Sequence, residues 1–88
     1  MARQAMDEIR AAAFDDRTLT SLTAAYLKAC GMLGNLANDA NRLRVAHGIV
    51  AYARSGLLDV EILASLAVRL VKGDPDVRRA VGYIDQRN

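Results

Sequence analysis

The sequence predicts an all-α protein, either a compact bundle or an orthogonal array of four to five short helices. Apolar residues recur at steps of three and four along the chain, which is the period of helices with one buried face. No segment shows the apolar and polar alternation that is typical of strands. With 88 residues, the chain has the length of one domain, so we expect a single helical domain over residues 1–88.

The first two helices are expected over residues 3–14 and from residue 15 or 16 to about residue 34. The first would place Met6, Ile9 and Ala13 on one face, and it is the segment that could lie apart from the core as an arm. Either Asp15 or Asp16 offers an N-cap for the second helix. Its expected end is marked by two glycines, and its apolar positions follow helical spacing. These residues are Leu19, Leu22, Tyr26, Ala29 or Cys30, and Leu33, followed by the end signals Gly31 and Gly34.

The third helix is predicted within a run that contains no acid, residues 40–55. Asn38 or Asp39 can cap its start, and Ser55 with Gly56 is typical of a helix end. The run combines a wide apolar face with a thin basic stripe, which indicates a helix near the centre of the fold.

The fourth and fifth helices are predicted over residues 60–72 and 75–86. Asp59 can cap the fourth, whose apolar face is very wide. Asp74 followed by Pro75 gives an N-cap and a proline at the first helical position of the fifth. The stretch over residues 71–81 is similar to the inter-helix turn of HEAT-type repeats, a resemblance confined to that turn that implies no family.

Composition narrows the functional classes. Twelve basic residues against ten acidic ones give a net charge of +2, too balanced to indicate a nucleic-acid-binding protein by itself. A single cysteine, Cys30, excludes an internal disulfide and fits a reduced, cytoplasmic setting. Acids near the N-terminus argue against a signal peptide, and no apolar run approaches the length of a membrane span. We therefore expect a cytoplasmic protein with no membrane partner.

The candidate binding surface is the basic stripe of the third helix. Arg44, His47, Ala51 and Arg54 fall within about one quadrant of a helical wheel, with Ala40 and Gly48 beside them. Small residues there would let a partner come close, so the stripe could form a shallow groove. The glycines Gly48 and Gly82 favour close helix crossings, within the fold or across a homodimer.

The favoured hypothesis is a small non-enzymatic protein-binding module, acting as a regulator, adaptor or inhibitor. Neither a metal site nor a cofactor is expected, because the lone His47 has no nearby second ligand. The acidic pairs at predicted helix starts are explained by capping rather than by catalysis. The alternative is a small DNA- or RNA-binding protein, which would use Arg42, Arg44, Arg54, Arg78 and Arg79.

Overall fold

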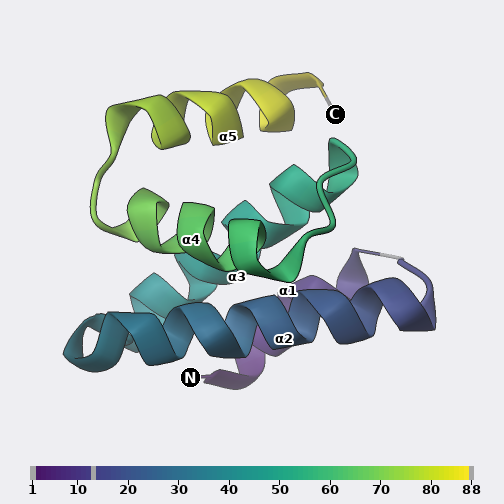
Figure 1. The fold of residues 1–88 in the computed structure, drawn as a ribbon, viewed down its shortest axis with the longest axis horizontal. Coiled ribbons are helices and arrows are strands. Elements are labelled where there is room, and N and C mark those ends of the chain that lie inside the picture. The colour runs from purple at the N-terminus through teal and green to yellow at the C-terminus, as the bar shows by residue number, and fades with distance from the viewer. Residues whose placement is uncertain (1, 13, 88) are drawn as a thin grey trace.

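The computed structural model describes the backbone of residues 2–12 and 14–87, and the side chains of residues 5–12 and 14–84. Within these ranges the chain forms five α-helices, one short 3-10 helix and no strand, so the predicted all-α class is confirmed. The elements are α1 (Ala2–Ala11), α2 (Asp16–Leu33), η1 (Gly34–Leu36), α3 (Asp39–Arg54), α4 (Val60–Val71) and α5 (Pro75–Arg87) (Figure 1).

Side-chain oxygens fix the starts of four helices. In each case an Asp or Asn oxygen accepts a hydrogen bond from a backbone N–H of the first helical turn, at 2.7 to 3.0 Å. Such caps satisfy donors that have no partner inside the helix. The capping residues are Asp15, Asn38, Asp59 and Asp74, all of which were among the caps predicted from the sequence.

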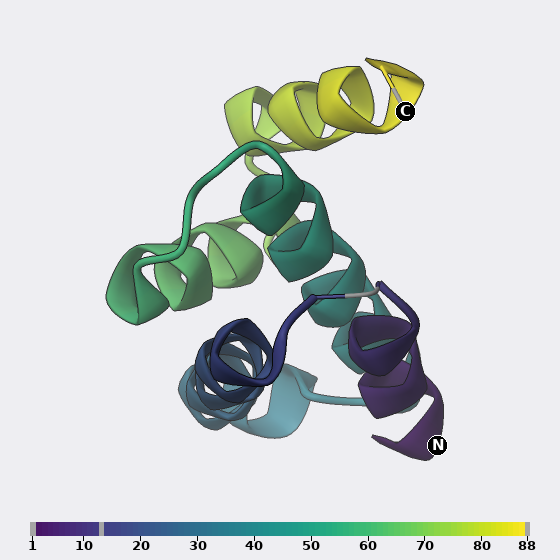
Figure 2. The same ribbon diagram turned by 90° about the vertical axis from the view of Figure 1, so that its right-hand side faces the viewer.

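Helix α3 is the central element, as its apolar face predicted, and it contacts each of the other four α-helices. Figure 2 shows it running between α1 and α2 at one end of the molecule and α5 at the other. The Cα radius of gyration is 11.5 Å, close to the value of about 12 Å expected for a compact domain of this length. The buried residues of α3 are Val45, Ala46, Gly48, Ile49, Val50, Ala51 and Ala53.

Helix α1 is part of the core, so the possibility of a loosely attached arm is wrong. Ala5 and Ile9 are 1% and 0% exposed and join the main apolar cluster. The helix ends at Ala11 rather than at residue 14. Ala13, which was expected on its apolar face, lies outside the described residues.

Of the two glycines expected to end α2, only Gly34 does so. Gly34 has a φ of +55°, a conformation that glycine adopts readily, and its N–H donates to the carbonyl oxygen of Cys30. Gly31 stays inside the helix, which continues to Leu33 because that side chain is buried in the core.

Helix α5 is held mainly by a small apolar cluster that is separate from the main core. Val77 and Val81 of α5 pack with Ala51 of α3, and these three residues are 2 to 5% exposed. The main core joins α1, α2, α3 and α4 instead. The fold is therefore a four-helix core with a fifth helix laid over α3 and α4. In the part of the chain that the structure describes, no helix has both the length and the apolar character needed to cross a bilayer.

Candidate partner-binding groove

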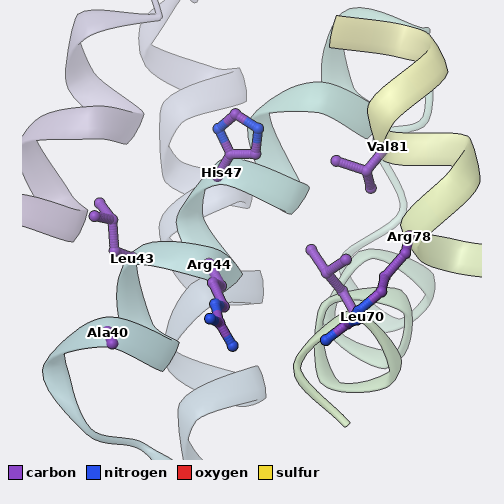
Figure 3. A pocket seen from close by; sticks show the side chains of 7 residues that line it. All are labelled: Ala40, Leu43, Arg44, His47, Leu70, Arg78 and Val81. Atoms are coloured by element: carbon purple, nitrogen blue, oxygen red, sulfur yellow. The ribbon is translucent and has the colours of Figure 1, made fainter. Parts of the chain in front are cut away.

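A groove of about 670 Å³ lies between the first half of α3 and the first half of α5 (Figure 3). The last turn of α4 contributes Leu70 between these two walls. The lining combines aliphatic side chains with three basic ones and includes no carboxylate. The lining residues are Ala40, Leu43, Arg44, His47, Leu70, Arg78 and Val81.

The α3 wall follows directly from helical spacing. Ala40, Arg44 and His47 are separated by four and three residues, so they project from one face of the helix. The start of this wall is anchored by Asn38, which caps α3, and by Asn41, whose Nδ2 donates to the carbonyl oxygen of Leu36 at 2.7 Å. These contacts set the direction in which α3 leaves η1.

The α5 wall is fixed by Asp74 at the turn after α4. Its Oδ2 accepts hydrogen bonds from Nε and Nη2 of Arg69 at 2.9 and 2.8 Å, while its Oδ1 accepts from the backbone N–H groups of Asp76 and Val77. The Arg69 guanidinium, followed by these two N–H groups, holds the pKa of the Asp74 carboxyl below its usual value. One carboxylate thus ties the end of α4 to the start of α5.

Arg78 stands one turn into α5 and reaches back over that connection. Its Nη2 lies 3.8 Å from the position that a Cβ atom would take on Gly73, whose φ is +88°. A side chain at position 73 would therefore strain the backbone and touch the Arg78 guanidinium. Because 3.8 Å is an ordinary van der Waals distance, the positive φ is what favours glycine at this position.

The position of Leu70 depends on a close crossing of α3 and α4. A Cβ atom on Gly48 would stand 2.8 Å from Cδ2 of Leu70, nearer than carbon atoms approach in packed proteins. The sequence-based expectation that Gly48 marks a close crossing inside the fold is confirmed. Gly82 shows no such crossing, because nothing lies within 4 Å of a Cβ built there.

The electrostatics of the groove are dominated by unpaired arginines. Within the described residues neither Arg44 nor Arg78 forms an ion pair with a carboxylate, and both are exposed. His47 lies near Glu8 of α1, with 4.0 Å between Nδ1 and Oε1, and both side chains are about half exposed. That contact is an ion pair only when the imidazole is protonated. The two guanidinium groups therefore make the groove basic at any pH at which the protein is folded.

The structure brings together two of the four residues predicted to form the binding stripe. Arg44 and His47 line the groove, and Arg54 is exposed near the end of α3 but does not line it. Ala51 does not belong to the surface, since it is only 2% exposed. The chain's own α5 covers it instead, packing on Ala51 through Val77 and Val81.

The five arginines considered for nucleic-acid binding do not form one surface. Arg44 and Arg78 line the groove, whereas Arg54 and Arg79 are exposed but not part of its lining. Arg42 is partly buried, its Nε has no hydrogen-bond partner, and it is close enough to influence the hydroxyl of Tyr26 on α2. Helix rotation separates Arg42 from Arg44 by about 200°, so they face different sides of α3.

Sequence reasoning missed the apolar half of the groove. Leu43, Leu70 and Val81 come from three different helices, and each looks like an ordinary core residue in its own segment. The close approach of Gly48 to α4 was the available signal, although it did not identify Leu70 as the neighbour. In the described ranges, no three His, Cys, Asp or Glu side chains are grouped in a way that could hold a metal ion.

Comparisons with protein-family models, with curated proteins and with solved structures found no match for this chain.

Proposed function

We propose that this protein is a small, non-enzymatic protein-binding module that docks an acidic partner protein in the groove between α3 and α5. The observation that carries the proposal is the pairing of aliphatic side chains with unpaired Arg44 and Arg78 in one groove. Aliphatic residues supply contact area that gains from leaving water. Arginine supplies forked donors that suit carboxylates, and such groups are common at protein interfaces.

The chemistry of the lining favours binding over catalysis. Arginine keeps its proton at all ordinary pH values, so Arg44 and Arg78 cannot act as general bases. His47 is the one lining side chain of a type that serves as a general base, and the lining contains no hydroxyl or thiol that it could activate. The carboxylate nearest to it in the ion-pair geometry is Glu8, which lies outside the lining. The proposed role is therefore recognition of a partner, as a regulator, adaptor or inhibitor.

The spread of arginines over several faces makes a nucleic-acid partner the less favoured reading. Phosphate-binding proteins gather basic residues along one face that follows the backbone of the nucleic acid. Here Arg42 faces away from Arg44, and the groove places aliphatic side chains between Arg44 and Arg78.

A charge-reversal capture experiment tests the proposal. The full chain is immobilised as wild type, as R44E/R78E, and as R17E/R79E, and each is exposed to nuclease-treated lysate of the source cells. The control pair changes the net charge equally, but Arg17 and Arg79 are exposed and lie outside the groove. We expect a protein that is retained by the wild type and by R17E/R79E and lost from R44E/R78E.

Two outcomes would overturn the proposal. One is capture of the same proteins by all three forms, which would show that the groove takes no part. The other is a partner that disappears after nuclease treatment and whose retention falls equally in both charge-reversal variants, which is the pattern of phosphate binding. Circular dichroism of each variant establishes beforehand that the fold is retained.

A further inference from the structure

The two arginines of the groove give it a direction. Arg44 and Arg78 come from opposite walls, and Figure 3 shows both side chains extending toward the same end, where Arg78 passes across Leu70 in this view. His47 and Val81 lie toward the other end of the same view. The two guanidinium groups are therefore gathered at one end of the groove. An occupant that fills the groove must bring carboxylates to that end, because covering an unpaired guanidinium without a partner is unfavourable.

The groove also limits the backbone of its occupant. Within the described residues there is no strand, and therefore no sheet edge to which an extended peptide could add. Proline-rich segments dock on aromatic side chains, and the lining contains none. Of the three common recognition modes that are defined by the backbone of the partner, this leaves a helix lying in a groove. Recognition of acidic groups by arginines is a further mode that can operate together with it.

The length of the α3 wall matches a short helical face. The lining residues of α3 run from Ala40 to His47, which spans two turns and about 10 Å along the axis. A partner helix would present apolar residues at positions i, i+3 or i+4, and i+7 over the same length. These would contact Leu43 and Leu70, which are partly exposed, while the nearly buried Val81 closes the floor of the groove.

We infer that the partner segment held in this groove is an acidic amphipathic α-helix whose Asp and Glu residues are gathered near one end, where they meet Arg44 and Arg78. This inference rests on the proposed function and names the chemistry of the partner. The apolar face of the helix lies against the aliphatic residues of the groove.

A peptide selection without a known partner tests the inference. A library of random peptides of about 16 residues, long enough for four helical turns, is selected by display against the full wild-type chain. Binders to R44E/R78E are removed in each round. The selected peptides are expected to carry Asp or Glu near one end, together with apolar residues at helical spacing. Their affinity for R44E/R78E is expected to fall by about tenfold or more, as for the loss of an interface anchor.

Variants of a selected peptide test separately whether binding requires the helix and whether it requires the acidic side chains. Replacing the acidic residues of a winner with Gln, or one central residue with Pro, should each weaken binding by about tenfold or more, since Pro breaks the helix and Gln removes its charge.

The outcomes distinguish this inference from the proposed function. Winners that depend on Arg44 and Arg78 but are proline-rich, or tolerate a central Pro, would overturn the helical partner and leave the protein-binding module intact. Winners without acids, or no winner that depends on those arginines, would overturn the inference outright. If the lysate experiment also showed no dependence on Arg44 and Arg78, the proposed function itself would fall.

Discussion

Gly48 and Leu70 meet at the crossing of α3 and α4, where a Cβ atom on Gly48 would stand only 2.8 Å from Leu70 Cδ2. The absence of that one carbon lets the Leu70 side chain lie directly over the α3 backbone, where it lines the groove. A glycine buried in the middle of a helix lowers helix stability by roughly 0.5–1 kcal/mol relative to alanine. At Gly48 this loss of helix stability is linked to the position of Leu70 in the groove.

The first prediction compares G48A with G82A. Gly82 is an exposed position of α5 with open space around it, so G82A should stabilise the fold by about 0.5–1 kcal/mol. G48A gains the same helix preference but must displace Cδ2 of Leu70, the end of a flexible and partly exposed side chain, so part of that gain is lost. Urea unfolding should therefore show a smaller stabilisation for G48A than for G82A.

The same pair of variants reports on the groove. Displaced Leu70 should narrow it, so G48A should weaken binding of a selected peptide while G82A does not. Equal stabilisation by both variants would show that Leu70 does not need to move.

The second prediction concerns the attachment of α5. Enlarging the buried Ala51 to Leu should push Val77 and Val81 outward, at a cost of about 1–3 kcal/mol. Because that cluster is separate from the main core, hydrogen exchange should accelerate in α5 while amides of α2 and α4 keep their protection. A24L, at an exposed position of α2, is the matched control. Equal loss of protection in all helices of A51L would mean that α5 unfolds only with the whole domain.

The third prediction is a loss of stability in alkali that originates at Tyr26. Burial, and then the neighbouring Cys30, raise the pKa of its hydroxyl to about 12, against about 10 in an unfolded chain. Between pH 10 and pH 12 the folded state keeps the Tyr26 proton, whereas the unfolded state releases it. The contribution of Tyr26 to the free energy of unfolding is therefore fully present below pH 10. It falls as pH rises toward 12, by at most about 2.7 kcal/mol for two pKa units. The variant Y26F should remove most of this slope in urea unfolding between pH 9 and about pH 11.5.

Near neutral pH, Y26F should be neutral or slightly stabilising. The Tyr26 hydroxyl is buried without a hydrogen-bond partner among the described residues, so its removal leaves no new unsatisfied group. The exposed Tyr83 gives the control Y83F, which should keep the alkaline loss. Some slope should remain in Y26F as well, because burial also raises the pKa of Tyr52. If Y26F lost as much stability above pH 10 as the wild type, Tyr26 would not be the source of that loss.

The fourth prediction is that the connection between α4 and α5 at Asp74 weakens in acid. Arg69 and two backbone N–H groups lower the pKa of this carboxyl, so its contribution to stability is present above the unfolded pKa near 4 and is lost as pH falls through the lower folded value. D74N should lower the melting temperature at pH 7 and flatten the loss of stability as the pH falls below about 4. The variant keeps an acceptor for capping α5 but loses the charge that pairs with Arg69. The melting temperatures of D74N and wild type are measured over this pH range. Parallel curves would show that the Asp74 carboxylate does not stabilise the fold.

The helices could be predicted from the sequence because their starts and periods are encoded locally. Asp59, and Asp74 with Pro75, mark helix starts that need no tertiary information. The stripe on α3 was only half recovered, because a helical wheel shows which residues share a face and not which helix covers them. Ala51 is hidden by α5, and Arg78 enters the same groove as Arg44 only after the turn at Gly73 has placed α5. Tyr26 likewise looked like a core residue, and its unsatisfied hydroxyl appears only once α2 and α3 are packed.

One wall of the groove belongs to a helix that is anchored by a cluster of three buried residues. If α5 is docked in only a fraction of molecules, the observed dissociation constant for any partner that needs both walls is the intrinsic one divided by that fraction. Partner affinity then depends on conformational selection as well as on contacts. Substitutions on the solvent side of α5, at positions such as Gly82 that need never meet the partner, would adjust the affinity by changing how often the second wall is in place.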